Sequence, residues 1–167
     1  GSRYDLRAAA GIHPGDFVFF QPAGVRRVKN IPIVIPRLAA LRRRHPGLRY
    51  VLAGPVIEPE EATRVTAALG GLPWATYLGA LEHAQICAGL SAVQAVINSS
   101  LSEGGMSNAV LEAMSKGVPV LASDIEGNRS VVADGEDGFL FASAAEFQEK
   151  AERLLSDPAL RVVMGHR

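Results

Sequence analysis

The feature that most constrains the fold is a regular alternation between short apolar runs and longer amphipathic segments. Each run is apolar throughout, which is typical of strands buried on both faces in a parallel sheet. Six such runs occur, at residues 17–20, 50–54, 75–78, 95–98, 118–123 and 139–141. Because crossovers between parallel strands are right-handed, the pattern predicts an α/β fold with a doubly wound, Rossmann-like parallel sheet.

The segments between these runs have the spacing and the end signals of helices. Ile35, Leu38 and Leu41 have helical spacing, in a helix that Asn30 is predicted to cap. Ser143 is predicted to cap another helix and to form a capping box with Glu146, three positions further on. The helix that Ser143 begins is predicted to span residues 143–155. Further helices are predicted at residues 59–69 and 82–90, with a helical turn at 128–133. We expect one domain spanning residues 1–167, in which residues 1–2 are a cleavage scar.

The composition excludes several classes of function. Lysine plus arginine equals aspartate plus glutamate, at 17 each, so no net field favours nucleic acid or an acidic membrane. No apolar run approaches the roughly 18 residues of a membrane-spanning helix. Cys87 is the single cysteine, which we interpret as a small core residue, and the four histidines show no metal-ligand spacing. We therefore expect a cytoplasmic protein with no nucleic-acid partner, no membrane span and no metal site.

Residues 98–127 carry most of the chemistry. This stretch, NSSLSEGGMSNAVLEAMSKGVPVLASDIEG, has the pattern of a strand end, a loop, a short helix and another strand. Backbone N–H groups at a helix start attract phosphate and hydroxyl oxygens, and Gly104, Gly105 and Ser107 let a ligand approach them. Glu103 and Glu112 flank this point and can accept hydrogen bonds from sugar hydroxyls. The combination indicates a ligand with both phosphate and hydroxyl groups, such as a nucleotide sugar.

Simpler interpretations stand beside these. Glu112 could form a solvent-exposed pair with Lys116, four residues further along the helix. Glu103 could be an ordinary loop acid. Lys29 could be an ordinary lysine near a helix start, although a cation is unfavourable there unless an anion binds. In a doubly wound sheet the ligand lies beyond the carboxyl ends of the strands, so the loops that follow the strands are the functional candidates.

The order of these motifs resembles the donor-binding half of the retaining glycosyltransferases of group 1, also called family 4. These enzymes have the GT-B fold, in which two Rossmann-like domains face each other. The resemblance is carried by S-E-G-G-M-S-N-x-x-L-E-A-M and G-V-P-V-L-A-S-D within residues 102–124, and it extends from Phe17 through Asp157. Pro22-Ala23-Gly24-Val25-Arg26 is similar to the branch of glycosyltransferase 1 domain-containing proteins.

The resemblance implies a role for each matching residue. Glu112 would accept hydrogen bonds from the ribose hydroxyls, and Glu103 would act at the reaction centre beside the donor sugar. Lys29 would be the second catalytic residue, because it would stabilise the charge that develops on the leaving diphosphate. Arg26 or Arg27 would share that task. Further donor contacts are implied for Gly24, Gly79, Leu81, Gly104, Gly105, Met106, Ser107 and Asn108.

Two departures from the family pattern leave alternatives open. Gly104 and Gly105 stand where relatives have a single glycine, which places one extra residue between Glu103 and Glu112. Either the loop bulges and both acids keep their places, or Glu103 is displaced. The arginines also lie closer to Lys29 than in relatives, so either of them could meet the phosphate.

The resemblance implies the donor-binding domain of a retaining glycosyltransferase, without its N-terminal acceptor domain. The donor would be a nucleotide-diphosphate sugar, with a UDP-sugar as the first candidate, and no cofactor or metal would be required. By itself the domain should bind the donor weakly and transfer nothing. The alternative is a non-catalytic nucleotide-sugar-binding or regulatory module on the same fold. A nucleotide-sugar epimerase or phosphorylase fits less well, because the paired-glutamate motif favours transferases.

Overall fold

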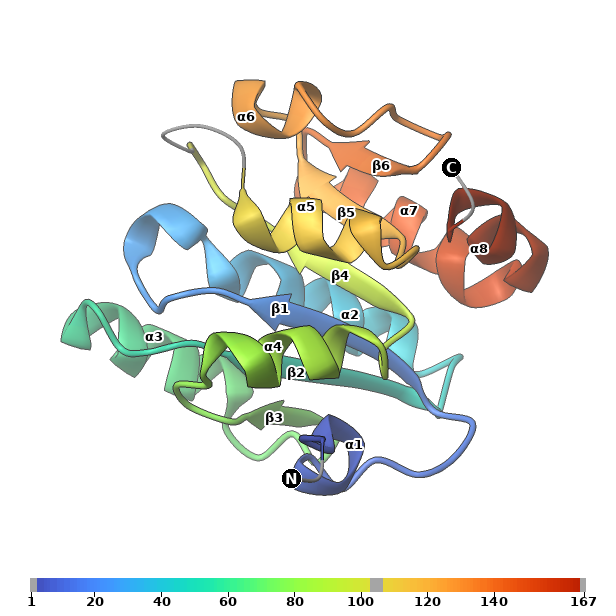
Figure 1. Ribbon diagram of the computed structural model, residues 1–167. Coiled ribbons are helices and arrows are strands. Elements are labelled where there is room, and N and C mark those ends of the chain that lie inside the picture. Colours follow the sequence, from blue (N-terminus) through green and yellow to red (C-terminus); the bar gives the residue numbers. More distant parts are fainter. Residues whose placement is uncertain (1–2, 103–106, 166–167) are drawn as a thin grey trace.

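The protein is described by a computed structural model that covers residues 3–102 and 107–165. The predicted site residues Glu103, Gly104, Gly105 and Met106 lie outside the described residues. The described residues form a six-stranded sheet with the order β3-β2-β1-β4-β5-β6 (Figure 1). Every neighbouring pair is parallel, which confirms the predicted doubly wound sheet. The strands are β1 (Phe17–Pro22), β2 (Leu48–Ala53), β3 (Ala75–Tyr77), β4 (Ala95–Asn98), β5 (Val120–Ser123) and β6 (Gly138–Phe141).

Helices cover both faces of this sheet (Figure 1). One face packs against the short α1 (Leu6–Ala9), α4 (His83–Leu90) and α5 (Asn108–Ser115). The other packs against α2 (Val34–Arg42), α3 (Pro59–Leu69), α7 (Ala144–Ser156) and α8 (Pro158–Gly165). Within β1, Val18 and Phe20 belong to the apolar cluster on the face covered by α1, α4 and α5, and Phe19 belongs to the cluster on the opposite face. Because successive side chains of a strand point to opposite faces, only a run that is apolar throughout can fill both clusters.

The helix preceding β2 begins later than predicted, and Asn30 does not cap it. Asn30 has a left-handed backbone, with φ 50° and ψ 38°, and it separates two short 3₁₀ turns, η1 (Arg27–Lys29) and η2 (Ile31–Ile33). Asparagine tolerates this conformation better than most residues. The helical turn predicted at 128–133 is also misplaced, since α6 spans Glu126–Arg129.

Other helix ends depend on hydrogen bonds that the pattern identified only in part. Ser143 caps α7 as predicted, because its hydroxyl accepts from the Glu146 N–H at 3.1 Å. The Glu146 carboxylate accepts from Ala142 instead of completing a capping box with Ser143. A complete capping box occurs at the start of α4, between Glu82 and Gln85. Neither α1 nor α8 was predicted. α1 has only four residues, and both helices depend on packing, α1 through Leu6 and α8 through Met164, against the apolar clusters on the two faces of the sheet.

The loops after β1, β2 and β3 contact one another at the carboxyl edge of the sheet. The Ala23 N–H donates to Ala53 at 2.8 Å, and the Gly54 N–H donates to the Gly79 carbonyl at 2.8 Å. A Cβ atom on Gly54 would lie 1.8 Å from the Ala23 carbonyl oxygen. Only glycine lets these loops approach so closely.

We therefore expect Gly54→Ala to lower the free energy of unfolding by about 1–3 kcal/mol or more, because the new methyl group meets rigid backbone. Urea unfolding followed by circular dichroism measures the change. Gly47→Ala is the matched control, since a Cβ on Gly47 meets its nearest neighbour at an ordinary 3.5 Å. Equal stability of the two variants would contradict this account of the loop packing.

Candidate functional site

The loops after β1 and β4 lie side by side where the strand order reverses. The Leu101 N–H donates to the Val28 carbonyl at 2.8 Å, and the Ser99 hydroxyl donates to the Lys29 carbonyl at 2.7 Å. These bonds attach the basic loop, which we define as residues 26–29, to the segment that leads toward α5. Ligands of doubly wound sheets bind at this reversal of strand order, so the candidate site has the expected position.

A buried chain of hydrogen bonds holds the basic loop in place. The Tyr50 hydroxyl donates to the Gln21 amide oxygen at 2.6 Å, and the Gln21 amide nitrogen donates to the Ser99 hydroxyl at 2.7 Å. Ser99 then donates to the Lys29 carbonyl. Burial raises the pKa of the Tyr50 hydroxyl far above its ordinary value, so Tyr50 keeps its proton and remains a donor. Gln21 directly follows the apolar run at residues 17–20, and no motif of the sequence predicted this role for it.

The three cationic residues of the basic loop differ in their exposure to solvent. Arg26 and Arg27 are exposed, whereas Lys29 is half-buried. The Arg27 backbone N–H donates to the Glu58 carboxylate at the start of α3, which joins this loop to the loop after β2. Both arginines border the carboxyl edge of the sheet, and the choice between them for a phosphate contact stays a prediction.

Three further residues with a predicted donor contact, Gly24, Gly79 and Leu81, lie on neighbouring loops. Gly79 has a positive φ of 75°, and its carbonyl oxygen accepts from Gly54. Leu81 is half-buried and packs against the apolar cluster beneath α4. Gly24 lies so close to Ile57 that a Cβ would meet the Ile57 side chain at 2.5 Å. These positions share one edge of the sheet with the basic loop, and their role in donor binding stays a prediction.

The start of α5 is formed by Ser107, whose side chain is buried. Its hydroxyl accepts from the Val110 N–H at 3.4 Å and so caps the helix. Asn108, the first residue of α5, is exposed. Val110 and Ala113 are buried against the sheet. Ser107 therefore has a structural task beside any contact of its backbone with a donor.

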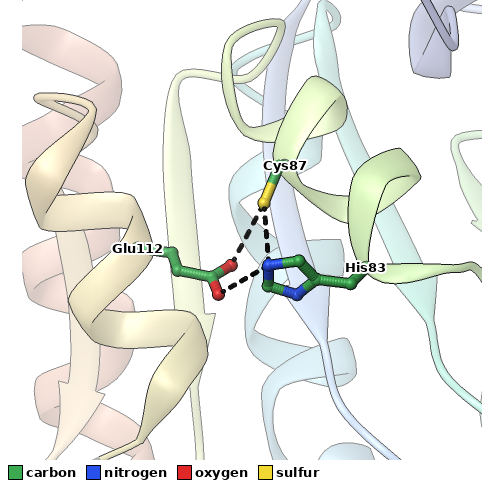
Figure 2. Close-up of side chains that lie close together, drawn as sticks. All are labelled: His83, Cys87 and Glu112. Atoms are coloured by element: carbon green, nitrogen blue, oxygen red, sulfur yellow. Dashed lines mark hydrogen bonds and ion pairs between the residues drawn. The ribbon is translucent and has the colours of Figure 1, made fainter.

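Glu112 points from α5 toward α4, where it meets His83 and Cys87 (Figure 2). One carboxylate oxygen lies 3.3 Å from Nε2 of His83, and the other lies 3.6 Å from Sγ of Cys87. Sγ of Cys87 is itself 3.4 Å from the same Nε2. Within the described part of the chain, the ion pair of Glu112 is thus with His83 and not with Lys116.

The interpretation of Cys87 as a core residue is wrong. Cys87 is half-buried and faces Glu112 of α5. The buried residues of α4 are Gly89 and Leu90. Partial desolvation raises the pKa of its thiol, and the Glu112 carboxylate raises it further, while Lys116 acts in the opposite direction. The sequence does contain a signal for this cluster, because His83 and Cys87 are four residues apart and therefore share one face of a helix.

An open groove of ≈ 810 Å³ lies beside this cluster. Cys87 and Lys116 line it together with Arg3, Tyr4 and Asp5, but the basic loop does not. The groove gives solvent access to the sulfur side of the cluster. Because its lining includes none of the strand-end loops after β1, β4 or β5, it does not mark the predicted donor site.

We expect Gln21→Leu to lower the free energy of unfolding by about 1–3 kcal/mol, because it leaves the buried Tyr50 hydroxyl without an acceptor. Adding Tyr50→Phe should recover part of the loss by removing that hydroxyl. Urea unfolding of both single variants and the double variant measures the coupling. Losses that simply add would show that the two side chains do not form a coupled chain.

A doubly wound parallel sheet whose order reverses between β1 and β4 defines a Rossmann-like α/β class of domain. The sequence model described as "Glycosyl transferases group 1" matches residues 16–157. The chain therefore belongs to the group 1 glycosyltransferase family, as the sequence resemblance indicated.

Individual relatives agree with this assignment. Glycosyltransferase 1 domain-containing protein 1 of Xenopus tropicalis is 33% identical over 138 residues, which cover 83% of this chain and 40% of that protein. The C-terminal domain of a group 1 glycosyltransferase from Francisella tularensis superposes with a TM-score of 0.79 at 23% identity, covering 98% of this chain and 87% of that one. Anabaena HepE in complex with UDP superposes with a TM-score of 0.83 at 21% identity, covering 96% of this chain and 44% of that one.

These comparisons confirm the predicted fold class, the C-terminal half of a GT-B glycosyltransferase. The chain spans about two fifths of the length of the curated relative from Xenopus tropicalis. Among the described residues, no helix combines the length and the apolar character needed to cross a membrane.

Proposed function

We propose that this chain is the nucleotide-sugar-binding domain of a retaining glycosyltransferase. The observation that carries the proposal is the junction between the basic loop and the loop after β4, at the reversal point of the sheet. It holds a loop that carries three cationic residues against Ser99 and Leu101, the residues that follow β4. A diphosphate and a sugar are the ligand groups that such a junction suits. Structures of the fold neighbour HepE contain UDP and, in another crystal, UDP-glucose, which supports a UDP-sugar as the first donor to test.

In this proposal the cations act on the leaving group. Negative charge develops on the diphosphate as the bond to the sugar breaks, and fixed cations from Lys29 and one of the arginines lower the free energy of that state. Lys29 belongs to η1, and its carbonyl accepts a hydrogen bond from Ser99. Its backbone would therefore need little rearrangement when the diphosphate binds. Glu103 remains the proposed residue at the donor sugar, and it lies outside the described residues.

Glu112 is proposed to accept hydrogen bonds from the ribose. Its side chain is 26% exposed, and its partner His83 is 76% exposed. An ion pair this open contributes about 0–1 kcal/mol, so ribose hydroxyls can replace it at low cost. The same contact also motivates the alternative function, a non-catalytic module in which Glu112 serves the α4–α5 contact alone.

Transfer is proposed to require a second domain that supplies the acceptor. The chain covers about two fifths of the curated relatives from Xenopus tropicalis and Bacillus subtilis, which leaves room in such proteins for that domain. We therefore propose that the domain by itself binds the donor weakly and transfers no sugar. Measurable transfer by this chain alone would contradict that statement.

Titration with UDP-, GDP- and ADP-sugars, followed by NMR, tests the proposed ligand. We expect one nucleotide class to shift the amide signals of Lys29, Ser107 and Glu112, and Glu112→Ala to weaken binding about tenfold by removing the ribose contact. Glu152→Ala is the matched control, because Glu152 pairs with His45 on α2's side of the sheet. The absence of any response to all three nucleotides would refute nucleotide-sugar binding. If Glu112→Ala bound the nucleotide sugar as tightly as the parent chain does, the ribose role of Glu112 would be refuted.

The phosphate role of the basic loop has its own test. Lys29→Met should weaken UDP binding about tenfold but leave uridine binding unchanged, because uridine has no phosphate for the cation to meet. Comparing Arg26→Ala with Arg27→Ala identifies the arginine that assists. Isothermal titration calorimetry measures each affinity, with Arg43→Ala at the exposed end of α2 as the control for net charge. An equal loss for UDP and uridine in Lys29→Met would exclude a phosphate contact.

A further inference from the structure

Three side chains of different chemistry converge between α4 and α5. His83 and Cys87 come from one face of α4, and Glu112 comes from the facing side of α5 (Figure 2). Nε2 of His83 lies 3.4 Å from Sγ of Cys87, and the Glu112 carboxylate offers one oxygen at 3.3 Å to the histidine and the other at 3.6 Å to the cysteine. One ligand atom from each residue can be chosen so that all lie within 4.8 Å of one another.

The arrangement differs from a proton relay. In a nucleophile–histidine–acid triad the acid and the nucleophile face different ring nitrogens, so that one nitrogen is oriented while the other moves the proton. Here the thiol and the carboxylate both face Nε2 of His83 (Figure 2). One nitrogen cannot donate to one partner while accepting from the other. Donor atoms of three residues that gather within 4.8 Å of one another are instead an arrangement that can hold a cation.

The distances also suit a metal ion. Zinc binds sulfur at about 2.3 Å and nitrogen or oxygen at about 2.0–2.2 Å, so tetrahedral ligands lie about 3.3–3.6 Å apart. The Nε2–Sγ separation of 3.4 Å and the separation of 3.3 Å between Nε2 and one carboxylate oxygen fall in that range, and the other carboxylate oxygen lies 3.6 Å from Sγ. The carboxylate uses a different oxygen for each partner, so it would bind bidentately or turn slightly. A thiolate and a carboxylate would together balance the charge of a divalent ion.

We propose that His83, Cys87 and Glu112 form a binding site for a divalent transition-metal ion, with Zn²⁺ as the best match. Thiolate and imidazole ligands favour Zn²⁺ over Mg²⁺ or Ca²⁺, which bind oxygen ligands. Three protein ligands leave a fourth position for water or an added ligand. The exposed ring of His83 and the groove beside Cys87 give the ion a path from solvent.

This site goes beyond donor binding, but it shares Glu112 with the proposed ribose contact. A carboxylate held by a metal on the α4 side has fewer acceptor sites left for a ribose, so the two uses of Glu112 compete. That consequence rests on the proposed function, whereas the metal site itself does not. The two are therefore measured separately: metal binding without nucleotide, and UDP binding with a chelator present. A failure of one then leaves the other measurement intact.

Titration of the untagged chain with Co²⁺ tests the site directly, because a thiolate bound to cobalt gives a near-ultraviolet charge-transfer band. Cys87 is the single cysteine, so the band reports on this sulfur alone. We expect the band to saturate at one equivalent and to be displaced by Zn²⁺. Cys87→Ser should abolish it, and His83→Ala or Glu112→Ala should weaken Co²⁺ binding roughly tenfold or more.

His45→Gln is the matched control, since Nε2 of His45 also meets a glutamate, Glu152, at 2.9 Å but has no cysteine beside it. It should bind Co²⁺ as the parent chain does. Thermal unfolding of the metal-free variants checks that each remains folded. The proposal is overturned if the parent chain shows no band, or if His83→Ala and Glu112→Ala bind Co²⁺ as tightly as the parent, which would mean that the thiol binds cobalt without them.

Discussion

Burial of the sheet on both faces is the constraint on which the rest of the structure depends. Because the strands are covered from both sides, polar groups can enter the interior only where strands end and where partners satisfy them. The chain from Tyr50 through Gln21 and Ser99 to the Lys29 carbonyl is such a case. It runs from β2 through β1 to the residue that follows β4, and β1 and β4 are the strands on either side of the reversal point. The same bonds that satisfy buried polar groups thus hold the basic loop at the ligand edge.

A second consequence follows from the way helices pack on one face. α4 and α5 cover the same side of the sheet, and both begin at the carboxyl edge of the sheet (Figure 1). His83, in the first turn of α4, therefore meets Glu112 in the second turn of α5. The residue that resemblance assigns to the ribose is thus placed within reach of a cysteine and a histidine. Donor binding and metal binding would compete for a single carboxylate.

Sequence patterns predicted the parts of the fold that depend on burial. The six strands lie within a few residues of their predicted bounds, because an apolar run has no other stable place in such a domain. Errors arose where local geometry decided the outcome. Asn30 adopts a left-handed backbone between two 3₁₀ turns, and hydrogen bonds from a distant loop to the Lys29 and Val28 carbonyls accompany that turn. No local pattern contains a bond between residues about seventy positions apart.

The sequence by itself determined the fold class, the family and the order in which the candidate donor loops occur, because these follow from periodicity and from a long motif. Only the tertiary structure decided which side chains meet. Cys87 looked like a core residue, since its neighbours on α4 are apolar, but its side chain faces α5 and contacts Glu112 there. Spacing within a helix shows which residues share a face. What that face meets depends on the neighbouring helix, and here the neighbour brings a carboxylate.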